Sequence, residues 1–129
     1  MINCIGPEIK ETTIIQSIKF WEKRGHNILF YEYEPQLEIC KTSYYSLDGF
    51  IILRKEDKVI KELDEGVLAS TYRKLIFSEI KSSEIIFSEG SYNYSLLLEH
   101  EMGHAFGYGH ISKLGYLMNP YYGLMGDKF

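Results

Sequence analysis

The sequence predicts an α+β fold with one twisted mixed sheet of about four to five strands and two main helices. Three observations lead to this prediction: apolar residues at helical spacing near the start, short β-rich runs in the middle, and a second helical segment near the end. The chain has 129 residues, of which 45% are hydrophobic and 25% charged. This size and composition indicate a single domain over residues 1–129.

The first helix is predicted over residues 8–24. Gly6-Pro7 precedes the segment and Gly25 follows it, which is the usual order of proline and glycine around a helix. The apolar residues recur at helical spacing, so one face is expected to be buried; they are Ile14, Ile15, Ile18 and Trp21.

Four segments rich in β-forming residues are predicted as strands: 27–34, 49–54, 66–74 and 84–88. The first alternates in polarity, whereas residues 49–54 are apolar at nearly every position and suit a strand that is covered on both faces. The charged run over residues 55–65 is expected to be a solvated loop or a short helix.

A second helix is predicted from about residue 92 to residue 108. Its apolar side chains fall on one side and are expected to pack on the core; they are Leu98, Met102, Ala105 and Phe106. Glu99 is predicted to face solvent.

Charge and hydropathy exclude several classes of partner. The net charge of −4 comes without a cluster of Lys and Arg, so no nucleic-acid partner is expected. No apolar run approaches the ~20 residues that cross a bilayer, and no secretory signal follows Met1, so no membrane partner is expected. A monomer is expected, and the location stays open between cytoplasm, virion and non-classical release.

Two cysteines are too few for a dense disulfide framework. Cys4 is expected in a short first strand, and Cys40 as a plain core or surface thiol. A bond between them requires an oxidising compartment, and the sequence does not decide it.

The strongest motif is H-E-x-x-H-x-x-G-x-x-H over residues 100–110. His100 and His104 lie one helical turn apart, so both imidazoles can reach one ion, and Gly107 allows the helix to end so that His110 can approach as a third ligand. Glu101 lies about 100° around the helix axis from His100, within reach of a water on that ion. Three nitrogen ligands leave one position open, which is typical of one catalytic Zn²⁺ ion.

This motif and the segment after it resemble the metzincin zinc peptidases and, within them, the matrixins. Met118 follows His110 by eight residues, as does the methionine whose tight turn lies beneath the metal in that family. Pro120 and Tyr122 match its Pro-x-Tyr, which implies that they form a wall of the pocket for the residue after the scissile bond. Residues 66–72 resemble the edge strand that pairs with substrate, which adds three expected pocket residues: Leu68, Ala69 and Ser70.

The chain also departs from the matrixin pattern. Ile111 stands where matrixins usually carry serine, and only His26 lies outside the motif, so a second, structural zinc site is not expected. No Asp/Gly-rich loop indicates calcium. Seven residues follow Tyr122, so a C-terminal helix is not expected and the resemblance implies a minimal form.

The resemblance and the motif together predict a zinc-dependent endopeptidase. Glu101 is the expected general base toward a metal-activated water, and the polypeptide substrate is expected to lie extended along the edge strand. The alternative is a zinc-stabilised structural or binding module of a larger, for example viral, assembly with little peptidase activity. A metallohydrolase of non-peptide amides fits less well, because the edge strand and the Pro-x-Tyr wall suit a peptide.

Overall fold

A computed structural model describes residues 1–29, 38–41, 47–57 and 63–129 of the chain. Its elements follow in the order β1 (Ile2–Asn3), α1 (Glu11–Glu22), α2 (Glu38–Lys41), β2 (Ile51–Lys55), β3 (Ala69–Ile76), β4 (Glu79–Phe87), α3 (Leu97–Ala105) and the short 3-10 helix η1 (Tyr122–Leu124).

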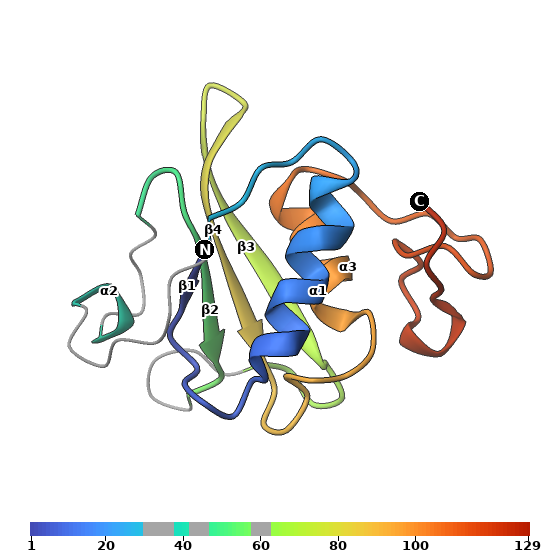
Figure 1. The fold of residues 1–129 in the computed structure, drawn as a ribbon, viewed down its shortest axis with the longest axis horizontal. Helices are drawn as coiled ribbons and strands as arrows, with labels where there is room; N and C mark the ends of the chain where they lie inside the picture. The colour runs from blue at the N-terminus through green and yellow to red at the C-terminus, as the bar shows by residue number, and fades with distance from the viewer. Residues whose placement is uncertain (30–37, 42–46, 58–62) are drawn as a thin grey trace.

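The described strands form one mixed sheet in the order β1-β2-β4-β3 (Figure 1). β1 pairs with β2 and β2 with β4 in parallel, whereas β3 runs antiparallel to β4. The α+β class with a single mixed sheet is therefore confirmed. β3 lies at the end of this order, so one of its sides has no partner strand among the described residues.

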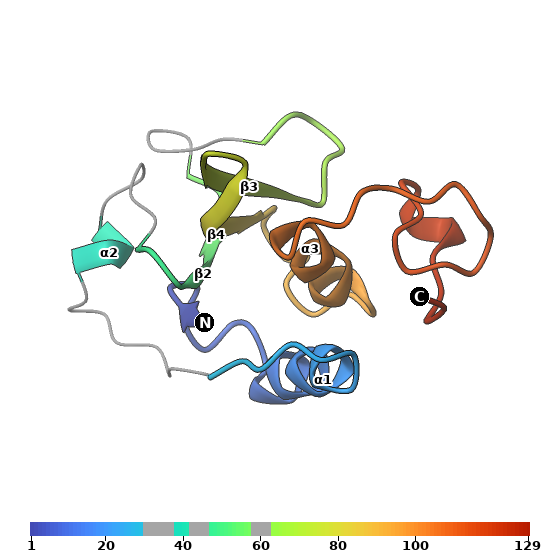
Figure 2. The same ribbon diagram turned by 90° about the horizontal axis from the view of Figure 1, so that it is seen from above.

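The two long helices cover one face of the sheet, and α2 lies on the other (Figure 2). The core lies between α1, α3 and the sheet, and its largest fully buried side chains include Trp21, Phe87, Leu98 and Met102. Since α3 packs on β3 and β4 as well as on α1, its position relative to the edge strand is fixed by the core.

Both helices end as their glycines predict. In α1 the Gly25 and His26 amides donate to the carbonyls of Glu22 and Trp21, and Gly25 has a φ of +93°. The helix is confirmed but begins later than residue 8, with Lys10 at its N-cap. Likewise α3 is shorter than predicted, because residues 92–96 form turns. None of the helices in the described ranges is long and apolar enough to span a membrane.

The strands predicted over 49–54, 66–74 and 84–88 are confirmed as β2, β3 and β4, but their limits differ. β2 is covered on both faces, as its apolar run predicts, because the adjacent side chains of Ile52 and Leu53 point to opposite faces and are both fully buried. β3 begins at Ala69, three residues later than predicted, and β4 begins at Glu79, five residues earlier. A two-residue turn joins them at Phe77 and Ser78, whose φ angles of 50° and 66° fit the type I′ geometry. This turn lacks the usual Asn-Gly signal, which is why the sequence does not predict it.

Two predicted segments fall partly outside the described residues. Residues 27–29 are not in a strand, and residues 30–34 of that predicted strand are not described. Of the charged run over 55–65, residues 58–62 are not described.

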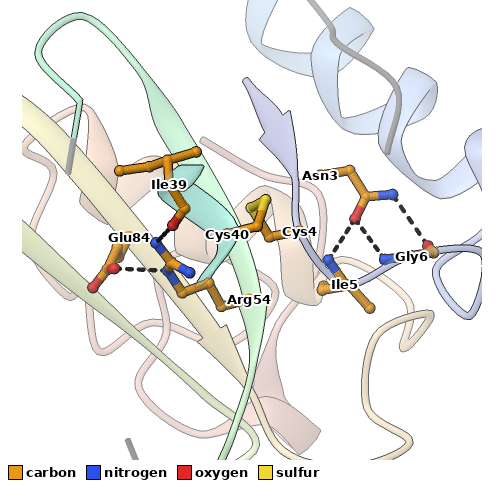
Figure 3. Close-up of a disulfide and its surroundings, with 8 residues drawn as sticks. All are labelled: Asn3, Cys4, Ile5, Gly6, Ile39, Cys40, Arg54 and Glu84. Atoms are coloured by element: carbon orange, nitrogen blue, oxygen red, sulfur yellow. Dashed lines mark hydrogen bonds and ion pairs between the residues drawn. A yellow bond between two sulfur atoms is a disulfide. The ribbon is translucent and has the colours of Figure 1, made fainter. Parts of the chain in front are cut away.

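A disulfide and a hydrogen bond from Arg54 hold α2 against the sheet (Figure 3). Cys4 and Cys40 are bonded, so the expectation of a plain thiol at Cys40 is wrong. Beside them the Arg54 guanidinium donates to the Ile39 carbonyl and pairs with the Glu84 carboxylate at 2.7 Å, with both side chains buried.

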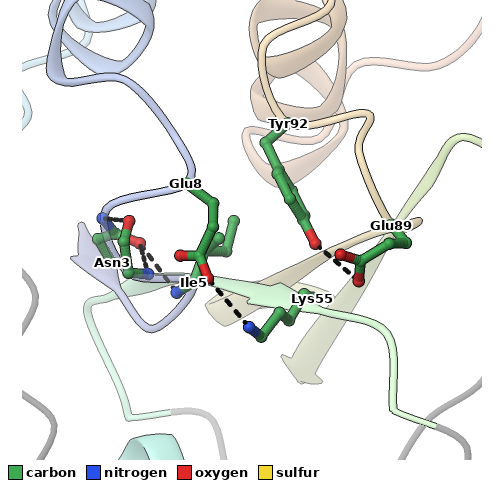
Figure 4. Close-up of polar contacts among 7 residues, drawn as sticks. Asn3, Ile5, Glu8, Lys55, Glu89 and Tyr92 are labelled. Atoms are coloured by element: carbon green, nitrogen blue, oxygen red, sulfur yellow. Dashed lines mark hydrogen bonds and ion pairs between the residues drawn. The ribbon is translucent and has the colours of Figure 1, made fainter.

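The segment between β1 and α1 is held by polar contacts at one end of the sheet (Figure 4). The Asn3 carboxamide oxygen accepts hydrogen bonds from the amides of Ile5 and Gly6. Glu8 pairs with Lys55 at the end of β2, at 3.3 Å. These contacts fix the chain as it turns from the sheet into α1.

Candidate metal centre and cleft

Three imidazoles converge at the start of the loop that follows α3. His104 Nε2 lies 3.2 Å from His100 Nε2 and 3.1 Å from His110 Nε2, and one nitrogen from each ring falls within 4.8 Å of the others. His100 and His104 lie on one face of α3, whereas His110 approaches from the loop. The helix ends through Gly107, at a φ of +102°, and the Tyr108 amide donates back to the Gly103 carbonyl.

Backbone carbonyls orient two of the three rings. His100 Nδ1 lies 2.7 Å from the Leu117 carbonyl oxygen, and His104 Nδ1 lies 2.9 Å from that of Tyr108. A carbonyl only accepts, so each Nδ1 carries the proton and each Nε2 holds a lone pair. This is the arrangement in which a histidine binds a metal through one nitrogen while its other nitrogen is fixed by a hydrogen bond.

The residues present fit a zinc ion. Two Nε2 lone pairs that face each other at 3.2 Å cannot form a hydrogen bond and repel unless they share a cation. Tetrahedral zinc with Zn–N bonds of about 2.0–2.1 Å separates its nitrogen ligands by about 3.3 Å. The two short separations in this triad are close to that value, and imidazole is a ligand that zinc favours.

Burial keeps the ligands ready for a metal. It lowers the pKa of His100 and of His104, and the backbone hydrogen bonds at Nδ1 oppose this only in part. Because a metal binds the neutral ring, a lowered pKa extends the pH range over which these two ligands are available.

Glu101 lies beside the triad and is anchored by the edge strand. Its carboxylate accepts a hydrogen bond of 2.6 Å from the Thr71 hydroxyl of β3, and the residue is 5% exposed. Burial raises the pKa of Glu101, while the Thr71 hydrogen bond and the neighbouring His104 oppose the rise. A carboxylate shifted in this direction is a stronger base than one in water.

A buried methionine, Met118, lies against α3 at Gly103. Met118 is fully buried, and a Cβ at Gly103 would come within 2.5 Å of its sulfur. Its carbonyl accepts from the Ile111 amide, and the preceding Leu117 carbonyl is the one that holds His100. Only glycine at position 103 therefore lets this loop approach the helix closely enough to orient the first histidine.

Two adjoining cavities border the triad. One, of about 480 Å³, lies between the loop after α3 and the start of β3; its lining includes Leu68, Ala69, His100, Pro120 and Tyr122. The other, of about 400 Å³, runs along β3, and its lining includes Ala69, Ser70, Thr71, Arg73 and all three histidines. Every residue predicted for the substrate pocket thus lines one of the two.

Sequence reasoning missed one contact of the site and misplaced one residue. The sequence does not predict a role for Thr71. The one signal for it is the spacing, since Thr71 follows Ala69 by two residues and therefore shares its face of β3. Glu99, predicted to face solvent, is 8% exposed, and burial raises its pKa. The prediction is wrong because α1 covers that side of α3, where the Trp21 indole donates to the Glu99 carbonyl.

His26 lies outside the metal centre but is not a free surface residue. Its Nε2 lies 3.1 Å from the Tyr108 hydroxyl and its ring stacks on Phe106 at 4.0 Å. It therefore supports the segment that ends α3. Among the described residues, the group that could hold a metal consists of the other three histidines and does not include His26.

Comparison with known proteins agrees with this geometry. A search of curated protein sequences gives no match. The family model described as Matrixin matches residues 6–129, which is nearly the whole chain. The matched region includes the three histidines, Glu101 and the loop with Met118. The chain therefore belongs to the matrixin family of zinc metallopeptidases.

Proposed function

We propose that the protein is a zinc-dependent endopeptidase in which Glu101 is the general base. The observation that carries this proposal is the convergence of three Nε2 atoms beside a buried carboxylate, at the border of two cavities and an edge strand. His100, His104 and His110 would hold one Zn²⁺ ion.

The chemistry requires a proton acceptor next to the attacking water. When bound, zinc lowers the pKa of a coordinated water toward neutrality and polarises a carbonyl group. Glu101 then accepts the proton from the water and delivers it to the departing amine, so that the carboxylate is regenerated. Thr71 fixes the position of the Glu101 carboxylate through its hydrogen bond of 2.6 Å.

The substrate is proposed to be a polypeptide that extends the sheet at β3. The outer side of β3 offers backbone donors and acceptors that have no partner strand among the described residues. Pro120 and Tyr122 would form a wall of the pocket for the residue after the scissile bond, together with Leu68 and Ala69. Tyr122 is held in place because its hydroxyl donates to the Ser95 carbonyl at 2.9 Å.

Met118 is proposed to form the floor beneath the metal. It is buried against Gly103, one residue before His104, and the adjacent Leu117 carbonyl orients His100. Its role is structural, since a thioether packed into the core contributes shape rather than acid–base chemistry.

The structural alternative makes a different use of the same ligands. A structural zinc site takes all its ligands from the protein and has no need for a carboxylate beside an open position. Here His110 is exposed and a cavity reaches all three histidines. The open cavity and Glu101 favour the catalytic function.

Glu101→Gln separates the two functions. This isosteric change should leave about one zinc per chain but lower the cleavage of a fluorogenic peptide mixture by about 10²- to 10⁴-fold, the usual contribution of a general base. Metal content is measured by elemental analysis and cleavage with and without a chelator. If the wild-type protein binds zinc and is destabilised by the chelator but cleaves nothing, the structural function is correct instead.

A further inference from the structure

The two cavities beside the histidines differ in charge. Among the described residues, the cavity that contains Pro120 and Tyr122 is lined by Glu101 but by no Lys or Arg, whereas the cavity along β3 is also lined by Arg73. Arg73 is the one Lys or Arg side chain in the lining that the described residues give this second cavity. Arg73 therefore gives this second cavity a positive charge that the first cavity lacks.

The register of the sheet directs Arg73 to the side of the metal centre. Side chains alternate along a strand, and Thr71, which contacts Glu101, shares its face with Arg73 two residues further on. Arg73 lies opposite Ser83 of β4, whose hydroxyl contacts the Ala105 carbonyl at the end of α3. Arg73 thus lies on the helix face, about 7 Å along the strand from Thr71.

Within the described chain, the Arg73 guanidinium has no carboxylate partner. The neighbouring cations do: Lys74 pairs with Asp48 at 2.9 Å, and Lys81 pairs with Glu79 at 3.1 Å. Glu101 is the acidic residue of the same cavity, but it is buried and accepts its hydrogen bond from Thr71. The charge of Arg73 is thus not neutralised within the cavity.

We propose that Arg73 selects an acidic side chain in the three residues that precede the scissile bond. The inference rests on the proposed peptidase function, in which the residue after the bond occupies the cavity at Pro120 and Tyr122. Residues before the bond then extend in the other direction along β3, from Ala69 toward Arg73, so the substrate runs antiparallel to β3. A guanidinium binds a carboxylate through a planar, bidentate contact, so Asp or Glu is the matching side chain.

The test compares acidic residues with their isosteric amides. Fluorogenic peptides carry one apolar residue after the scissile bond and either Glu or Gln, or Asp or Asn, at each of the three positions before it. The wild type should cleave the best acidic peptide with a kcat/KM about two- to fivefold above that of its amide partner, which is the range for an exposed ion pair. Arg73→Gln should remove this preference and Arg73→Glu should reverse it.

Lys74→Gln is the matched control. It removes a neighbouring cation from the same strand, but one that is paired with Asp48 and lies on the other face. It should keep the acidic preference of the wild type. Equal cleavage of acidic and amide peptides by the wild type, or an unchanged preference in Arg73→Gln, would overturn the inference while leaving the peptidase function intact. Absence of any chelator-sensitive cleavage by the wild type would instead overturn the proposed function.

Discussion

The two faces of the sheet are stabilised in different ways. The helix face carries the metal centre and is built from apolar packing of α1 and α3, with backbone carbonyls that orient His100 and His104. The opposite face holds α2 by a disulfide and by a hydrogen bond from the Arg54 guanidinium to the Ile39 carbonyl. Different contacts therefore fix the geometry of the histidines and the position of α2, and we expect that each set can be perturbed alone.

The largest effect is expected from removing the disulfide. Replacing both Cys4 and Cys40 by serine opens a link between residues separated by 36 positions, which should lower the free energy of unfolding by about 3–4 kcal/mol. The zinc affinity of the folded protein should change less than twofold. Urea denaturation measures the first and a competition titration with a chromogenic chelator the second. A tenfold loss of zinc affinity would show that the two faces are coupled.

Gly103→Ala perturbs the helix face instead. Alanine is the better helix former by about 1 kcal/mol, but its Cβ would lie 2.5 Å from the Met118 sulfur, with Trp21 at 3.2 Å. A net destabilisation of about 1–2 kcal/mol is expected, because overpacking in a closed core outweighs helix propensity. Zinc affinity should fall as well, since Met118 is next to the carbonyl that orients His100.

Gly109→Ala is the control for that variant. A Cβ at Gly109 meets nothing within 4 Å, and its φ is not in the left-handed region. Its stability and zinc affinity should stay near those of the wild type. A loss at Gly109 equal to that at Gly103 would mean that the close approach of Met118 is not the cause.

Thr71→Val tests how the edge strand contributes to catalysis. Valine keeps the shape but cannot donate the 2.6 Å hydrogen bond to Glu101, so kcat/KM should fall by at least about tenfold, which corresponds to the lower end of the range for hydrogen bonds to charged groups. Thr71→Ser retains the hydroxyl and should recover most of the activity. Zinc content should not differ among the three proteins, and a change in metal content would place the effect on the ligands instead.

The smallest effect is expected from Glu99→Gln, and it depends on pH. The folded-state pKa of Glu99 is raised by burial, so its ionisation lowers stability as the pH rises through that value. Glutamine removes this cost, and the variant should melt at a higher temperature than the wild type at pH 7. The difference should vanish at pH 4, where both side chains are neutral. Thermal melts of the zinc-free proteins, in excess chelator, at the two pH values provide the measurement; a difference that persists at pH 4 would point to packing.

Local patterns made the grouping of the three histidines predictable from the sequence. His100, Glu101 and His104 occupy adjacent turns of one helix, and Gly107 ends it where the motif requires, so short-range geometry is sufficient. The existence of β2, β3 and β4 was predictable for the same reason. Their limits were not, because the turn at Phe77 and Ser78 is imposed by pairing between β3 and β4 and not by residues that favour it.

Contacts between distant segments account for the remaining errors. Glu99 is buried by α1, whose Trp21 contacts it across a sequence separation of 78 residues. The contact of Thr71 with Glu101 spans 30 positions and requires the register of β3 against α3. The bond between Cys4 and Cys40 depends on where residues 38–41 lie against the sheet. In each case the deciding information is the tertiary arrangement.

The position of β3 at the edge of the described sheet has a kinetic consequence for a peptidase of this kind. A strand partner must present several consecutive backbone groups that are not already hydrogen-bonded, and a segment inside a folded helix or sheet cannot do so until it opens. When opening and closing are fast relative to cleavage, the rate against a folded protein follows the equilibrium population of the open segment. The stability of the target, and not only its sequence, would then determine which bonds are cut.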